Sequence, residues 1–135
     1  GCEVLSRTEK TACPGDVPVF LVDTMGEVPL FYAASDIAFV GGSLVPVGGH
    51  NLLEPAAQAL AIVTGPHLFN AQDIADLFEQ ANAFRRVTDS DELATMVTYL
   101  LQNPASARQI GKNGLELLKQ NRGALQRLVE LIPLP

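Results

Sequence analysis

Short apolar runs alternate with amphipathic stretches along most of the chain, and this alternation limits the fold more than any other feature. The runs Pro18–Val22, Ile37–Val40 and Ala61–Thr64 are nearly continuous in branched or aromatic residues, as expected of strands buried on both faces of a parallel sheet. Between them and after them, apolar residues recur at helical spacing, for example from residue 74 to residue 81. The pattern predicts an α/β fold with a Rossmann-like parallel sheet and right-handed crossovers.

Length and charge narrow the class of protein. The chain has 135 residues and a net charge of −6, which predicts one soluble globular domain. No cluster of basic residues exceeds Arg85-Arg86, so a nucleic acid is not an expected partner. The sequence also lacks an apolar run of about eighteen residues that would span a membrane. His50 and His67 belong to no metal-ligand pattern, and we expect neither a metal nor a cofactor.

A glycine-rich stretch after the second of these strands is the first candidate site. Residues 39–55 read F-V-G-G-S-L-V-P-V-G-G-H-N-L-L-E-P. Strand-to-helix joints usually have about two to six residues, but this one runs from Gly41 to His50. Surplus backbone at the carboxyl end of a strand is where open α/β sheets bind ligands. Four glycines there can take positive φ and turn N–H groups toward an anion. Neither G-x-x-x-x-G-K-[ST] nor G-x-G-x-x-G is present, so the stretch predicts a phosphate site of another kind.

Asn51 and Glu54 allow two interpretations. The carboxylate of Glu54 can accept both hydroxyls of a ribose, with the amide of Asn51 beside it. Asn followed three residues later by Glu is also the capping-box pattern, which would use both side chains only to satisfy the end of a helix. Pro55 argues against the box, because it would stand too early in the first turn. We therefore expect a helix that begins near Leu53 or Glu54 and runs to Leu60.

A second loop, Asp23–Glu27, directly follows the strand Pro18–Val22. Parallel strands of one sheet share a carboxyl end, and successive strands are often neighbours. We therefore expect this loop and the glycine-rich stretch to face the same rim and to grip one ligand.

Several motifs in a fixed order resemble one family. They are D-T-M-G-E at 23–27, F-V-G-G-S-L at 39–44, G-G-H-N-L-L-E-P at 48–55, G-P-H-x-F-N at 65–70 and N-R-G-A-L-Q-R-L at 121–128. Together they resemble the C-terminal domain of 3-deoxy-D-manno-octulosonic acid (Kdo) transferase. The resemblance implies a GT-B glycosyltransferase that moves Kdo from CMP-Kdo to the lipid A precursor in lipopolysaccharide biosynthesis, at the cytoplasmic face of the inner membrane.

The resemblance also implies roles for residues on both loops. It implies that Met25, Gly26 and Glu27 contact the CMP part of the donor, and that Asn51, Leu52, Leu53 and Glu54 form the other wall. Candidate phosphate or sugar contacts are Gly42, Ser43, Gly49 and His50. Ser43 can equally be a turn residue, and His67 is expected to be structural.

The chain departs from the family in its extent. A Kdo transferase is much longer, and its N-terminal domain supplies the acceptor site and the general-base carboxylate. Residues 1–135 are therefore expected to be part of the C-terminal CMP-Kdo-binding domain, without its first strand, to hold no catalytic residue and to be inactive alone. An open sheet edge would favour a fragment dimer, and membrane association is expected only of the full-length enzyme. The alternatives are a non-catalytic nucleotide-binding module and an assembly domain.

Overall fold

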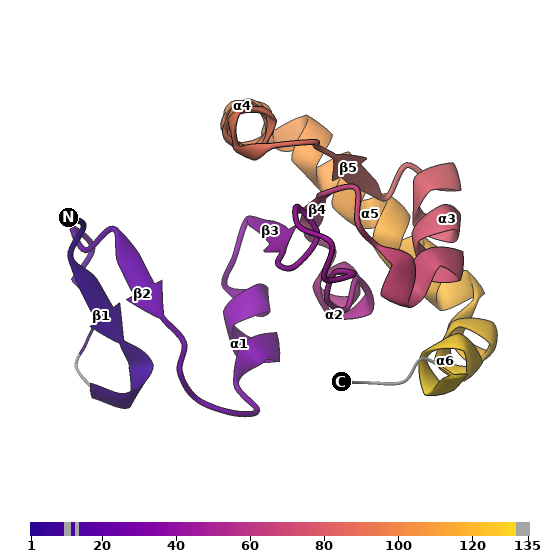
Figure 1. Cartoon of the computed structure of the whole chain (residues 1–135), viewed down its shortest axis with the longest axis horizontal. Coiled ribbons are helices and arrows are strands. Elements are labelled where there is room, and N and C mark those ends of the chain that lie inside the picture. The colour runs from indigo at the N-terminus through magenta and orange to yellow at the C-terminus, as the bar shows by residue number, and fades with distance from the viewer. Residues whose placement is uncertain (10–11, 13, 132–135) are drawn as a thin grey trace.

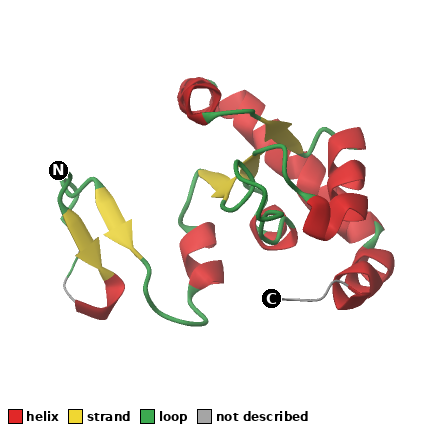
Figure 2. Ribbon diagram, in the orientation of Figure 1, coloured by secondary structure: helices red, strands yellow, loops and turns green. Residues whose placement is uncertain are grey.

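The chain folds into short parallel strands connected by helices (Figures 1 and 2). A computed structural model describes residues 1–9, 12 and 14–131, apart from the side chains at positions 125, 126, 128 and 129. The strands are β1 (Val4–Ser6), β2 (Val19–Leu21), β3 (Ile37–Val40), β4 (Ala61–Thr64) and β5 (Phe84–Arg86). The helices are η1 (Arg7–Glu9), α1 (Val28–Ala33), α2 (Leu53–Ala57), η2 (Phe69–Ala71), α3 (Gln72–Gln80), α4 (Ser90–Gln102), α5 (Pro104–Gln120) and α6 (Arg122–Leu131).

The strands form two sheets, both of them parallel. β1 pairs with β2, and β3, β4 and β5 form a second sheet in that order. Figure 1 shows the β1–β2 pair at one end of the molecule, with α1 between it and the larger sheet. The parallel α/β architecture is confirmed, but the expectation that the first two long apolar runs lie in one sheet is not met. Apolar composition indicates a strand but does not specify its partner. β2 pairs with β1 and not, as the sequence had suggested, with β3.

The centre of the larger sheet is β4, which is buried on both faces. None of its four residues is more than 1% exposed. Ile62 packs with residues of α2 and α3, including Ala56 and Phe78. Ala61 and Val63 point the other way, into a cluster with Leu100 of α4 and Ile110 of α5. This two-sided burial explains why the strand is apolar at every position but Thr64. Parallel pairing with β3, in which Val40 lies opposite Thr64, places the carboxyl ends of the two strands side by side.

Helix α2 is shorter than the sequence indicated. It ends at Ala57, three residues before Leu60, because Ala59 adopts a left-handed conformation with φ of 55°. The Leu60 N–H donates to Pro55 O at 3.1 Å, and Ala59 N–H to Ala56 O at 3.0 Å. These two bonds form a Schellman ending, whose usual signal is glycine. With alanine at that position, the sequence carried no stop signal.

The end of α2 makes a close contact that Gly111 permits. A Cβ added to Gly111 would lie 1.8 Å from the carbonyl oxygen of Ala59, whereas one added to Gly114, one turn later in α5, would lie 3.4 Å from Ala56 Cβ. We expect Gly111→Ala to lower the free energy of unfolding by about 1–3 kcal/mol or more, because added volume strains a packed core.

The matched variant Gly114→Ala should cost little, since an ordinary contact is combined with better helix propensity. Denaturant unfolding followed by circular dichroism measures both variants. Equal stability of the two would contradict the close packing of α5 on the end of α2.

Candidate functional site

The glycine-rich segment forms a loop that closes on itself. Gly49 N–H donates to Gly42 O at 3.0 Å and His50 N–H to Gly41 O at 3.2 Å. Gly42, Gly48 and Gly49 have φ of 71°, 106° and 73°, a region that side chains with a Cβ rarely adopt. The glycines therefore serve the shape of the loop, which projects from the carboxyl end of β3.

The closed loop is fastened to the segment that follows β4. His67 N–H donates to Ser43 O at 2.9 Å, and Asn70 Nδ2 donates to Val47 O at 3.1 Å. Ser43 is fully buried, and its hydroxyl accepts from Gly65 N–H at 2.8 Å while donating to Val40 O. These bonds favour the turn role for Ser43 over ligand contact, and they give His67 a structural role through its main chain.

The Asn51–Glu54 segment does not form a capping box. Asn51 Oδ1 accepts from Leu53 N–H at 2.9 Å, two residues ahead, and α2 has no side-chain cap. The Glu54 side chain is exposed and makes no hydrogen bond or ion pair with the described residues. Leu52 is only 1% exposed and belongs to the core, so its side chain faces away from any ligand. Since α2 has five residues, its dipole adds little to an anion site.

The loop after β2 is held by the segment after β1. Thr8 donates to the Asp23 carboxylate through its N–H, at 3.0 Å, and through its hydroxyl. Arg7 Nη2 donates to Glu27 Oε1 at 3.1 Å, and the Thr24 hydroxyl donates to Glu27 Oε2. The bond from the Thr8 hydroxyl lowers the pKa of Asp23, and the Thr24 hydroxyl, with Arg7, lowers the pKa of Glu27. Both carboxylates are thus engaged, while Met25 at the loop tip is 97% exposed.

Helix packing, not a shared sheet, connects the two loops. α1 begins directly after Glu27 and contacts α2, which carries Glu54. The pKa of Tyr32 in α1 is raised by burial and, in addition, by the negative charge of Glu54. The predicted contacts Met25–Glu27 and Asn51–Glu54 therefore lie at the starts of two helices in contact. Contrary to expectation, the two loops do not share one sheet rim, because β2 and β3 belong to different sheets.

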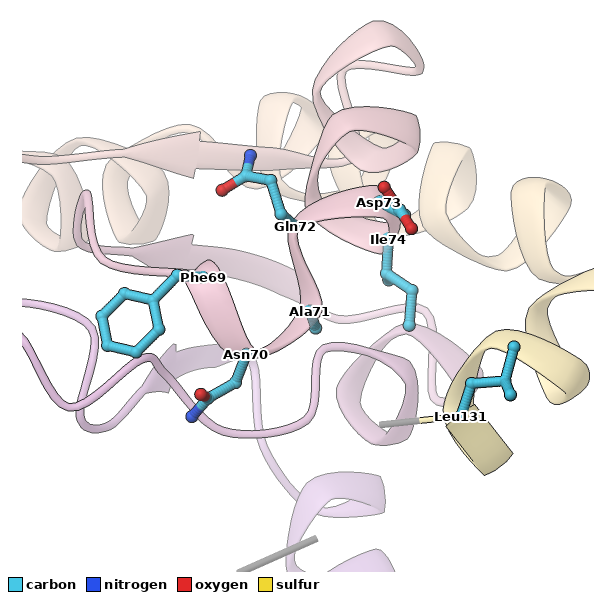
Figure 3. A pocket seen from close by; sticks show the side chains of 7 residues that line it. All are labelled: Phe69, Asn70, Ala71, Gln72, Asp73, Ile74 and Leu131. Carbon is cyan, nitrogen blue, oxygen red and sulfur yellow. The ribbon is translucent and has the colours of Figure 1, made fainter. Parts of the chain in front are cut away.

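A shallow hollow of about 240 Å³ lies beside the glycine-rich loop (Figure 3). It is formed by η2, the first turn of α3 and Leu131 of α6. Ile74 and Leu131 face one another there, while Phe69 points away from α6. None of the predicted nucleotide contacts lines this hollow, so it is not the site that the motifs indicate. Of the predicted contacts, Met25, Gly26, Asn51 and Glu54 are exposed, whereas Leu52 is buried.

Arg7, Thr8 and Asn70 have roles that sequence reasoning missed. Arg7 and Thr8 hold the Asp23–Glu27 loop, and Asn70 holds the glycine-rich loop. Arg7 and Thr8 directly follow β1 and so occupy the carboxyl end of a sheet, but no sequence motif marked them. For Asn70 the signal was its place in the G-P-H-x-F-N motif.

A parallel α/β domain with elaborated loops at the carboxyl ends of its strands is an architecture that binds nucleotides in many proteins. Residues 22–132 match the model of the glycosyl transferase-like family, and the chain belongs to that family. Two curated relatives are both named 3-deoxy-D-manno-octulosonic acid transferase. The Haemophilus influenzae protein is 46% identical over 84% of this chain and 27% of its own length. The Bordetella pertussis protein is 33% identical over 98% of this chain and 31% of its own.

A solved structure supports the same relationship. The C-terminal CMP-Kdo binding domain of WaaA from Acinetobacter baumannii superposes with a TM-score of 0.81 at 35% identity, covering 86% of this chain and 61% of that one. The resemblance to Kdo transferases and the expected fold class are thereby confirmed. The chain spans about a third or less of the length of these curated relatives.

The described residues show neither a membrane-spanning helix nor a metal-binding cluster. No helix among them is long and apolar enough to cross a bilayer. They also contain no group of three or more His, Cys, Asp or Glu side chains arranged to hold a metal ion.

The engaged carboxylates predict a measurable pH dependence. We expect NMR titration to give pKa values below 3.8 for Asp23 and below 4.5 for Glu27. A pKa lowered in the folded state means that the loop contacts stabilise the fold above the unfolded pKa and are lost as pH falls through the folded value. The loop should therefore loosen only below about pH 4.

Threonine variants test the cause of each shift. Thr8→Ala should raise the pKa of Asp23, and Thr24→Ala that of Glu27, while Thr95→Ala on the exposed side of α4 should change neither. Ordinary pKa values in the unmodified chain would contradict the network.

Proposed function

We propose that this chain is the donor-binding part of a Kdo transferase and binds CMP-Kdo. The observation that carries the proposal is the likeness, at 35% identity over 86% of the chain, to a domain described as CMP-Kdo binding. The named transferases at 33% and 46% identity support the same donor.

The nucleotide contacts that we propose are Met25, Gly26 and Glu27 on one side and Asn51, Leu52, Leu53 and Glu54 on the other. Leu52 would contribute only its main chain, because its side chain is buried. Both Glu27 oxygens already accept hydrogen bonds, so we assign the main-chain N–H groups around Gly26, with its φ of 80°, to the nucleotide. Glu54 has an unengaged carboxylate, which suits the two hydroxyls of a ribose. Gly42, Gly49 and His50 remain candidates for the phosphate or sugar.

In the full-length protein, the reaction would transfer Kdo to the lipid A precursor at the cytoplasmic face of the inner membrane. The bond between the Kdo anomeric carbon and the phosphate oxygen breaks, and its electron pair stays on the phosphate of CMP. An acceptor hydroxyl oxygen bonds to that carbon, and its proton passes to a carboxylate of the acceptor domain. Negative charge grows on the phosphate as CMP leaves, so preorganised N–H groups in this chain would stabilise the transition state. The chain alone is proposed to bind without catalysing transfer.

Base selectivity is the most direct test of the proposed donor. Two-dimensional NMR titration of the chain should show saturable shifts with CMP, centred on residues 23–27 and 51–54, and much smaller shifts with UMP at equal concentration. Equal responses to CMP and UMP would point to a non-selective nucleotide-binding module. No response to either would favour an assembly domain.

The proposed ribose contact has its own test. Glu54→Gln should weaken CMP binding by about 1–3 kcal/mol, because a hydrogen bond to a charged group is lost. Glu130→Gln, an exposed change of the same kind on α6, is the matched control and should bind as the unmodified chain does. Unchanged affinity for 2′,3′-dideoxy-CMP relative to CMP in the unmodified chain would rule out the ribose role.

A further inference from the structure

The proposed donor site is short of positive charge. No Lys or Arg occurs from residue 11 to residue 84, the segment that contains every proposed donor contact. The same segment places Asp23, Glu27 and Glu54 on or beside the two loops. CMP-Kdo carries a phosphate and a sugar carboxylate, both negative. A cation near these carboxylates would strengthen the binding of an anionic donor.

Arg7 is the cation that the fold brings to this place. It follows β1, and its Nη2 lies 3.1 Å from Glu27 Oε1. The described residues accept only this one hydrogen bond from its side chain, although a guanidinium has five N–H donors in a planar fork that matches phosphate or carboxylate. Its side chain is 39% exposed, so the remaining donors are accessible.

The arginines on the larger sheet and on α5 are differently placed. Arg85 in β5 donates to Phe84 O at 3.0 Å. Arg86 at the end of β5 already donates to Pro66 O and to Glu79, and its guanidinium covers the Phe84 ring. Arg108 lies on α5, beside the first residues of β3 and β4, which is the opposite end of the strands from the loops. Of these, Arg7 alone combines contact with a proposed donor loop and unused donors.

Glu27 orients this guanidinium. The Thr24 hydroxyl donates to the second oxygen of Glu27, and the bond from Thr8 to Asp23 holds the loop. The Glu27 carboxylate that binds Arg7 is therefore restricted in its rotation. We propose that Arg7 is a donor-binding residue: Glu27 holds its guanidinium by one N–H, and the others bind the phosphate of the cytidylate. This inference rests on the proposed function and adds a residue outside the motifs that suggested it.

The test compares CMP with cytidine, which lacks the phosphate. Calorimetric or NMR titration of the 135-residue chain is carried out for the unmodified protein, Arg7→Ala, Arg7→Lys and the control Arg108→Ala. Arg7→Ala should weaken CMP binding by about ten-fold or more and change cytidine binding by less than about two-fold. Arg7→Lys should lie between, because lysine keeps the charge without the fork. Arg108→Ala should match the unmodified chain.

The salt dependence of binding provides a second test, because it would not change if Arg7 had only a structural role. The preference for CMP over cytidine should fall with added NaCl in the unmodified chain, because salt screens the attraction of Arg7 for the phosphate. It should not fall in Arg7→Ala, where salt screens only the repulsion from the nearby carboxylates. Arg7→Lys keeps the comparison usable if the alanine variant does not fold. Two outcomes would overturn the inference. One is unchanged CMP binding in the Arg7 variants. The other is an equal loss of CMP and cytidine binding, which would mean that Arg7 only orders the loop. Failure of the unmodified chain to bind CMP would overturn the proposed function, and the inference with it.

Discussion

Burial of β4 on both faces is the constraint on which the larger part of this structure depends. Ile62 anchors one layer of helices, and Ala61 and Val63 anchor the other, so the strand can be neither exposed nor displaced without loss of both layers. Because β3 pairs with it in parallel register, the ends Val40 and Thr64 lie together. The loops that follow them are therefore adjacent before any loop contact forms.

Because the loops after β3 and β4 are adjacent, hydrogen bonds can form between them. The buried hydroxyl of Ser43 connects Val40 to Gly65, and a Cβ at Gly65 would lie 2.3 Å from Ser43 O. Asn70 then holds the far side of the glycine-rich loop through Val47. A loop with three residues at positive φ would otherwise sample many conformations, and these contacts restrict it at the side of the sheet where ligands bind in related folds. Neither strand of the β1–β2 pair has a fully buried residue, so the loop after β2 depends on the polar contacts of Arg7 and Thr8 rather than on a core.

Much of the fold could be predicted from local sequence. The bounds of β3 and β4 agree with the predicted runs Ile37–Val40 and Ala61–Thr64 residue for residue, and each run is followed directly by a glycine. Helix α2 begins at Leu53 as Pro55 indicated. Its end could not be predicted, since Ala59 takes a left-handed conformation in place of glycine. The pairing of β2 with β1 could not be predicted either, because β-branched residues favour a strand without determining which strand it pairs with.

For the candidate site, too, part was predictable from the sequence and part depended on the tertiary structure. By itself, the sequence determined which segments are unusual: glycines and motifs mark 23–27 and 41–54 because backbone freedom and residue order are local properties. Only the tertiary structure decided how these residues are used. It buried Ser43 and Leu52, left Glu54 unengaged, and brought Arg7 to Glu27 across twenty positions of the chain. Burial and pairing between distant residues depend on which surfaces meet when the helices and sheets pack, and no local pattern encodes that.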